Sequence, residues 1–270
     1  MPYPTQQLMR VIAMFMLLSV FPHGASAIGS CGLQKGLYKT IAQVQGTGLI
    51  SPLKGKQVVI EGVVTMALQG AYNDPQYKGF WLQQHSLSNT SGKTPLHKSL
   101  TASQGIFVYH ANTKVKSGQV VRVLGTVDEY QNLTELKKIQ QLLICSPTNA
   151  SAKALAANLP EPIDISLPVK HIIDLERFEG MRIRFQQSLI VSDLHGAGDG
   201  LGNYGQVAVS SRLHFQPTEY LSATEVLNTP GLLTARDKDY LLVDDGTTKR
   251  YPSYIPFPNQ QGYSANNTLR

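Results

Sequence analysis

Five stretches in the first half of the chain have the hydrophobic pattern of β-strands. Their apolar residues alternate with polar ones or form short β-branched runs, and segments rich in Gly, Asn and Ser separate them. The expected strands span residues 58–69, 79–83, 105–109, 119–130 and 134–145. Gly62 and Gly125 lie inside the first and fourth strands, where a strand bends or bulges. This pattern predicts a small closed Greek-key barrel of the OB type.

The second half of the chain repeats the beginning of this pattern. Residues 178–196 resemble residues 53–70, since each has a Gly, a charged residue and then a long β run that ends in a Gly-containing loop. Residues 204–211 and 239–247 are the expected second and third strands, and no counterpart of residues 118–136 follows them. We therefore expect an all-β chain, in which a five-stranded OB-fold barrel precedes a second OB-like β domain that is incomplete at the C-terminus.

Composition places the boundary between the two domains near residue 158. Residues 146–168 are rich in Ser, Ala and Pro and suit a linker. Residues 28–158 hold 13 Lys or Arg against 5 Asp or Glu, a net charge of +8, whereas residues 159–270 hold 10 against 13, a net charge of −3. The basic surface is therefore expected on the first domain.

Residues 1–27 have the three parts of a secretory signal peptide. Arg10 precedes an apolar run over residues 11–21, and Ala25-Ser26-Ala27 forms an A-x-A cleavage site. The run is shorter than the about 20 apolar residues that a membrane span needs. We expect a secreted or periplasmic protein that begins near Ile28 and has no membrane anchor; an uncleaved, anchoring signal is the alternative.

Cys31 and Cys145 are the two cysteines of the chain. An even pair in an exported protein is most simply a disulfide, and two free thiols are the alternative. Two cysteines are too few for a structural zinc site, which usually takes four Cys or His ligands.

Several segments together resemble the N-terminal region of secreted bacterial nucleases of the ExeM type. They cover nearly all of the expected mature chain, and the most specific is GTVDEYQNLTEL at residues 125–136. The others are residues 41–65, 79–83, 105–109, 178–185, 203–211, 215–220, 241–247 and 264–270. Asn203 departs from the pattern, in which a basic residue precedes Tyr-Gly.

The resemblance implies an OB-like domain and a second β region that precede a catalytic domain of the endonuclease/exonuclease/phosphatase family. That domain would use a divalent metal (Mg²⁺, Mn²⁺ or Ca²⁺), but its sequence is not part of this chain. We therefore expect no catalytic residue, metal site or cofactor in these 270 residues.

The residues themselves offer little for catalysis. Asp244-Asp245-Gly246 suits a turn after a strand better than a metal site, and His195 suits a solvated loop better than a catalytic role. Residues 200–205, GLGNYG, match GxGxxG by letter, but a β run is expected after them where a dinucleotide site needs a helix. No P-loop, HExxH or GxSxG motif occurs.

The first domain offers more for binding. Non-specific binding of single-stranded nucleic acid combines a basic groove with aromatic platforms, and in OB folds the loops between strands one and two and between strands four and five frame the ligand face. The predicted contacts with single-stranded DNA or RNA are Lys56, Tyr72, Lys78, Trp81, Tyr109, Lys114, Lys116, Arg122 and Tyr130. The alternative is that the lysines only solubilise the domain and that Phe80 and Trp81 divide between core and surface, since neighbours on a strand point to opposite faces.

Two functions therefore remain open. The first is the nucleic-acid-binding N-terminal portion of a secreted nuclease, and the second is a secreted OB module that binds carbohydrate or a protein partner. Binding to phosphates weakens steeply with salt, whereas binding to sugars changes little, so salt dependence discriminates between them. The sequence predicts no oligomeric state.

Overall fold

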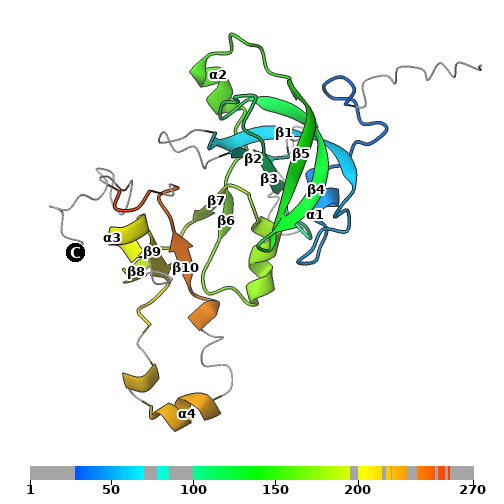
Figure 1. The fold of residues 1–270 in the computed structure, drawn as a ribbon. Coiled ribbons are helices and arrows are strands. Elements are labelled where there is room, and N and C mark those ends of the chain that lie inside the picture. Colours follow the sequence, from blue (N-terminus) through cyan, green and yellow to red (C-terminus); the bar gives the residue numbers. More distant parts are fainter. Residues whose placement is uncertain are drawn as a thin grey trace, which may run out of the picture.

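The first half of the chain forms a closed five-stranded barrel (Figure 1). The computed structural model describes residues 28–69, 78–84, 100–194, 200–214, 217–219, 221–229, 236–246, 249–252 and 255. The barrel strands are β1 (Gln57–Ala67), β2 (Gly79–Gln83), β3 (Gly105–Tyr109), β4 (Val120–Tyr130) and β5 (Leu133–Ile144). Their order is β1-β2-β3-β5-β4, with β4 paired to β1, and only the β3–β5 pair among them is parallel. The predicted all-β class and OB-type barrel are confirmed, with strand ends within two residues of the expected ones.

Two glycines allow the long strands to curve around the barrel. A Cβ on Gly62 would lie 2.5 Å from the carbonyl oxygen of Gln83, and a Cβ on Gly125 would lie 2.7 Å from the side chain of Ile139. The β4–β5 register shifts at Gly125, so this glycine marks a bulge. β1 pairs with β4 over its first part and with β2 over its last part, as a bent strand must.

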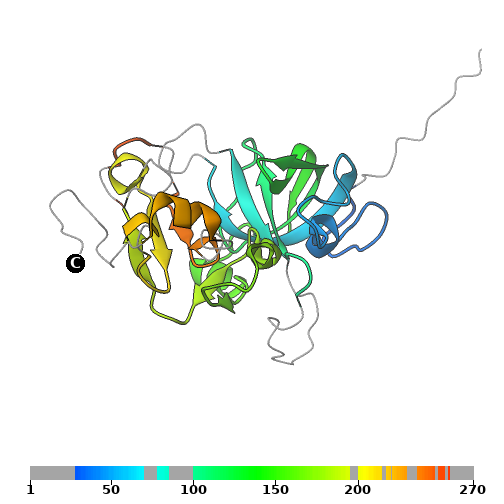
Figure 2. The same ribbon diagram turned by 90° about the horizontal axis from the view of Figure 1, so that it is seen from below.

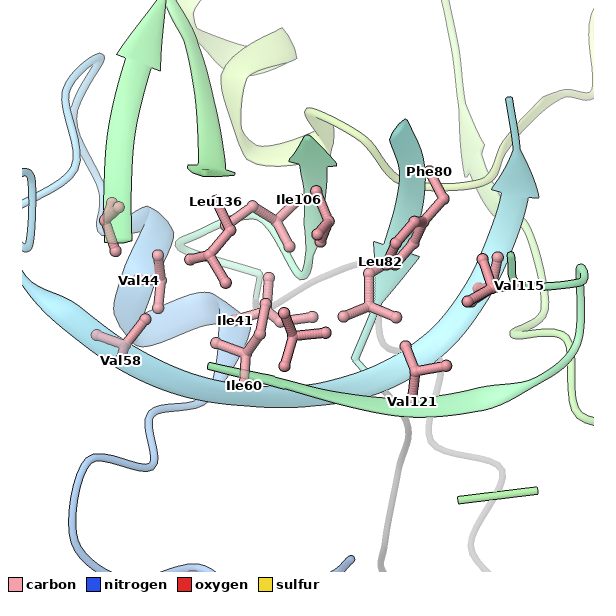
Figure 3. Packing of buried hydrophobic residues seen from close by; sticks show 14 residues of the cluster. Ile41, Val44, Val58, Ile60, Phe80, Leu82, Ile106, Val115, Val121 and Leu136 are labelled. Carbon is pink, nitrogen blue, oxygen red and sulfur yellow. The ribbon is translucent and has the colours of Figure 1, made fainter. Parts of the chain in front are cut away.

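Apolar side chains fill the barrel interior (Figure 3). Val58 and Ile60 from β1 meet Leu82 from β2 and Leu136 from β5, and each is at most 2% exposed. The short helix α1 (Ile41–Gln45) closes one end, with Ile41 and Val44 in the same cluster. Because its interior is packed, the barrel can bind a ligand only on its outer surface.

The N-terminal strap, defined here as residues 28–38, crosses the outside of β1 and β4. A disulfide between Cys31 and Cys145 ties it to the end of β5, which confirms the predicted cross-link. Tyr38 forms a parallel bridge with Val59, and Ile28 packs with Val59 and Leu124. The strap therefore covers a second, smaller apolar cluster outside the barrel.

The segment predicted as a linker is ordered and packs on the barrel. It contains α2 (Ala152–Ala157) and β6 (Ile163–Ile165) and is followed by η3 (Ile172–Phe178) and β7 (Ile183–Phe185). β6 and β7 pair in parallel, and their apolar residues cluster with Leu100 from the first half. The predicted boundary near residue 158 therefore falls within a segment that packs against the barrel.

The remaining described elements build a separate three-stranded sheet (Figures 1 and 2). It has the antiparallel order β10-β9-β8, as expected for three consecutive strands. Its strands and the neighbouring helices are β8 (Ile190–Asp193), α3 (Gly200–Tyr204), β9 (Val207–Ser210), η4 (Pro217–Glu219), α4 (Ala223–Asn228) and β10 (Leu241–Val243). None of the described helices is long and apolar enough to cross a membrane.

The single long strand predicted over residues 178–196 is wrong. The chain is divided there into the end of η3, then β7 and β8, and it bends at Gln186 and Gln187. The amide of Gln187 accepts from the backbone N–H of Leu167 at 3.0 Å and donates to the carbonyl of Leu167 at 2.8 Å. This side chain takes the place of a backbone ladder partner, so the strand stops after β7.

Candidate nucleic-acid interface

Exposed cations gather at the end of the barrel where β1 and β3 finish and β2 and β4 begin. Lys78 directly precedes β2, Tyr109 ends β3, and Lys114 and Lys116 lie in the loop that leads to β4. The three lysines are exposed, and Tyr109 is 47% exposed. We call these four residues the basic end; they are the predicted contacts that the structure brings to one place.

Gln69, at the end of β1, fixes the loop of the basic end. Its Nε2 donates to the carbonyls of His110, at 2.5 Å, and Thr113, at 2.8 Å, and its Oε1 accepts from the backbone N–H of Val115 at 3.0 Å. Lys114 Nζ in turn donates to the carbonyl of Gln69 at 3.0 Å. Sequence reasoning missed Gln69 because its partners lie more than 40 residues away.

His110 supports this loop and is not a charged contact. Its Nε2 accepts a hydrogen bond from the backbone N–H of Thr113 at 3.1 Å. Burial lowers the pKa of His110 below its ordinary value, so the ring is neutral at pH 7. The positive charge of the basic end therefore comes from its lysines.

Trp81 and Phe107 lie side by side on the outer face of β2 and β3. Their ring centroids are 5.1 Å apart at an interplanar angle of 60°. Phe80 points into the core and Trp81 outward, so the predicted division of these two residues between core and surface is confirmed. The other part of that alternative, lysines that only solubilise the domain, stays open. Trp81 is partly buried. Gly180 lies against its ring and covers part of it. The role of Trp81 as a contact for nucleic acid stays a prediction.

Arg122 is not a surface contact, and its assignment to the interface is wrong. Its side chain is 1% exposed and forms an ion pair with Glu61, with 3.0 Å between Nη1 and Oε2. It also donates to the backbone carbonyls of Ile28 and Leu33 in the N-terminal strap. The guanidinium is thus fully engaged beneath the strap.

The other predicted contacts are separated from the basic end. Lys56 precedes β1 and Tyr130 ends β4, so both lie at the opposite end of the barrel. Tyr130 is 60% exposed and precedes a two-residue turn in which Gln131 and Asn132 have positive φ. Tyr72, like the loop candidate His195, lies outside the described residues.

Several carboxyl groups lie near that opposite end, together with Lys56 and Lys137. Burial is the main cause that raises the pKa of Glu135, Glu176 and Glu179, and Glu129 raises all three further through its charge. The pKa of Glu179 reaches about 7. This end therefore carries charges of both signs, whereas the lysines of the basic end favour a polyanion.

A cavity of about 370 Å³ lies beside these carboxyl groups. It is bounded by residues 45–48 after α1, by residues 100–103 before β3, and by η3. Gln45, Thr47, Thr101 and Ser103 give it neutral polar groups, and Asp174 and Glu176 give it acidic ones. Arg177 also lines it and pairs with Asp174. Such a lining suits hydroxyl groups better than phosphates.

The described residues do not fit a catalytic metal. Asp244 accepts from Gln206 Nε2 at 2.6 Å and from the backbone N–H of Gly246 at 2.7 Å, which confirms that it belongs to a turn. Within the described part of the chain, the one group of His, Cys, Asp or Glu ligand atoms close enough to share an ion is Cys31, Glu61 and Cys145. Both of these sulfurs are in the disulfide, and Glu61 binds Arg122.

The rejection of GLGNYG as a nucleotide motif is confirmed by the element that follows it. Strand β9 (Val207–Ser210) comes after these residues, where a dinucleotide site needs a helix. Residues 200–204 of the motif form the short helix α3, which includes Gly200 and Gly202. α3 has only five residues, and the positive φ of Gly205 ends it before β9. It is too short to provide the helix of a dinucleotide site.

Ser211, His214 and Asp239 form a hydrogen-bonded cluster that the sequence did not suggest. Asp239 accepts from the backbone N–H of Ser211 at 2.9 Å and from its hydroxyl at 2.8 Å, and His214 Nε2 lies 2.8 Å from the same carboxylate. The serine hydroxyl donates to the carboxylate and not to the imidazole, so this is not a nucleophile activated by histidine. The cluster joins the end of β9 to the segment before β10.

No protein-family model matches the chain, and no curated protein matches its sequence. The resemblance to ExeM-type nucleases therefore stays a prediction from its sequence motifs.

Proposed function

We propose that the barrel binds single-stranded nucleic acid without sequence preference, and that the chain is the nucleic-acid-binding N-terminal portion of a secreted nuclease. The observation that supports binding most directly is the basic end. There, three exposed lysines and the exposed Tyr109 lie at the same end of the barrel, and Gln69 holds the loop in place. A basic surface beside an aromatic ring is what non-specific single-strand binding needs.

Export and the absence of cutting belong to the same proposal. The Cys31–Cys145 disulfide supports an oxidising compartment, because disulfides persist there and are rare in the cytosol. Hydrolysis of a phosphodiester through a divalent metal would fall to a catalytic domain outside this chain. Residues 28–270 should therefore bind DNA or RNA and leave them intact in Mg²⁺, Mn²⁺ or Ca²⁺.

Salt titration of binding to a fluorescent oligonucleotide tests the proposal. With roughly three phosphates contacted, the log–log salt slope should be near −2, at about −0.7 per contact. The triple variant Lys78→Ala, Lys114→Ala, Lys116→Ala should lose most of the affinity and most of this slope. The matched control Lys35→Ala, Lys54→Ala, Lys56→Ala removes the same charge from exposed positions outside the basic end and should keep the slope.

Stacking is tested separately from charge. Tyr109→Ala should cost about 1–3 kcal/mol of binding free energy if a base stacks on the ring. Tyr130→Ala removes a more exposed ring at the other end and should have little effect. Equal losses for the two tyrosines, or for the two lysine triples, would contradict a site at the basic end.

The cavity supports one alternative, a site for carbohydrate. Its amide, hydroxyl and carboxyl groups match sugar hydroxyls, and such binding would change little with salt. Failure of the folded chain to bind any oligonucleotide at low salt, together with salt-independent binding of an oligosaccharide, would favour this reading.

A further inference from the structure

Part of the chain's own second half lies across the outer face of β2 and β3. We call residues 178–182 the cover segment. Ser103 Oγ donates to the carbonyl of Glu179 at 2.6 Å, and the backbone N–H of Arg182 donates to Gln83 Oε1 at 3.0 Å. The cover segment is thus attached at the edge of β2 and just before β3, on the face that OB folds use for ligands.

Gly180 brings the cover segment into direct contact with Trp81. Its φ is +65°, and a Cβ built on it would lie 2.7 Å from Cζ3 of the Trp81 ring. Only a residue without a side chain allows the backbone to approach the ring so closely. A nucleic-acid base cannot stack on this side of Trp81 while Gly180 is there.

Glu179 holds the cover segment through neutral donors only. Its Oε1 accepts from Gln45 Nε2 at 2.9 Å and from the backbone N–H of Thr134 at 3.2 Å. The nearby cations are engaged elsewhere, since Arg177 on η3 pairs with Asp174 at 3.2 Å and Arg182 Nη1 donates to the carbonyl of Pro160.

The ionisable groups that surround Glu179 are mainly acidic. Glu176 on η3 and Glu129 on β4 act on Glu179 through their charges. The same two elements and β5 also carry the Asp174–Arg177 pair, Asp128, Glu135 and Lys137. Lys137 pairs with Asp128, and neither α1 nor β3 carries a charged residue. An anionic Glu179 in the docked segment is therefore partly desolvated, next to Glu176 and Glu129.

We propose that the cover segment is an intramolecular gate that closes the Trp81 side of the ligand face when Glu179 is neutral and opens it when Glu179 becomes an anion. The ligand admitted, single-stranded nucleic acid, rests on the function proposed above. Opening would extend the site from the basic end across Trp81 and Phe107.

The direction of the pH dependence follows from the environment of Glu179. Burial raises the pKa of Glu179 to about 7 in the docked state, from an ordinary 4.5. The docked state thus binds the proton more tightly than the undocked state does. Docking is strongest below pH 4.5, weakens as the pH rises to about 7, and changes little above that.

Trp81 is the single tryptophan of the chain, so its fluorescence reports the gate without any ligand. In residues 28–270, we expect emission at longer wavelength and stronger acrylamide quenching at pH 8 than at pH 5. Glu179→Gln should keep the pH 5 values at pH 8, because the amide stays neutral and can accept the same hydrogen bonds. Glu161→Gln, an exposed position, is the matched control and should behave like the wild type.

The gate proposal is contradicted if Trp81 emission and quenching in the wild type are the same at pH 5 and pH 8. It is also contradicted if the emission of Glu179→Gln shifts with pH as that of the wild type does. Gly180→Ala gives a second route, because its Cβ collides with the Trp81 ring and should open the gate at pH 5. Native far-UV circular dichroism shows that each variant is folded.

Quenching of Trp81 by oligo(dT) then tests the ligand. In the wild type, quenching by oligo(dT) should be several-fold stronger at pH 8 than at pH 5. In Glu179→Gln, this quenching should be weak at both pH values. If emission shifts with pH but oligo(dT) quenches at neither value, the gate stands and the nucleic-acid assignment to this face fails.

Discussion

Glu61 and Arg122 face each other across β1 and β4 and form an ion pair whose side chains are 5% and 1% exposed. The N-terminal strap lies over this pair and binds both partners. The backbone N–H of Gly32 donates to Glu61 Oε2 at 2.8 Å, and Arg122 Nε donates to the carbonyl of Ile28 at 2.6 Å. The ion pair therefore fixes the strap as well as the two strands.

Breaking this pair should be costly because the remaining charge is left buried. We expect Arg122→Met to lower the free energy of unfolding by about 3–5 kcal/mol. Arg184→Met is the matched control, since Arg184 pairs with Asp164 on the surface with 54% of its side chain exposed, and it should cost less than about 1 kcal/mol. Urea unfolding of both variants measures the difference, and similar losses would show that the strap adds nothing to the pair.

The disulfide should contribute about as much to the free energy of unfolding as the ion pair of Glu61 and Arg122 does. It joins residues 114 positions apart, and closing so long a loop restricts the unfolded chain by about 4 kcal/mol in the chain-entropy description. The double variant Cys31→Ser, Cys145→Ser should lose stability of that order in urea unfolding while it keeps the barrel's circular dichroism. Alkylation of the unreduced, denatured protein should label neither cysteine, and labelling of both would show that the bond is absent.

Gly62 should not tolerate a methyl group. The Cβ of an alanine there would lie 2.5 Å from the carbonyl oxygen of Gln83, a backbone atom that cannot move without disturbing β2. We expect Gly62→Ala to destabilise the protein by about 1–3 kcal/mol. Gly48→Ala, in a loop with nothing within 4 Å of the new atom, should change the thermal midpoint little. Equal midpoints for the two variants would refute the close contact.

Asp239 should stabilise the second sheet above acid pH. Burial alone would raise the pKa of Asp239, but hydrogen bonds from Ser211 and His214 outweigh it and hold that pKa below its ordinary 3.8. Because the folded pKa is depressed, the contribution is present above pH 3.8 and is lost as the pH falls through the folded pKa. Asp239→Asn should therefore be less stable than the wild type at pH 6. The difference between their free energies of unfolding should narrow below pH 4. The exposed Asp237→Asn is the control and should show no such narrowing.

The barrel was predictable because each of its strands carries its own pattern. Alternation required one of Phe80 and Trp81 to be buried, and Gly62 and Gly125 marked the curved positions. These features are local, so they can be read from short stretches of sequence. The shorter strands of the second half lack such alternation, and a side-chain contact between Gln187 and Leu167, 20 residues apart, ends one of them.

The candidate site was less predictable because it depends on what covers the outer face of the barrel. Alternation correctly places Arg122 outside the barrel, since Val121 and Val123 point into the core, but it does not show that the strap lies over it. Likewise, Gln45 and Glu179 are 134 residues apart, and no short motif joins them. Sequence distance thus concealed both the loss of Arg122 from the surface and the cover over Trp81.

The position of Ile28 also constrains the order in which an exported chain would mature. Its side chain is 7% exposed, and its carbonyl is bound by Arg122, so the docked strap withholds this residue from any enzyme. If the chain is exported as proposed and cut between Ala27 and Ile28, the leader peptidase would need an extended chain on both sides of that bond. Cleavage would therefore have to come before the strap docks and before Cys31 meets Cys145, and a chain oxidised too early would keep its leader.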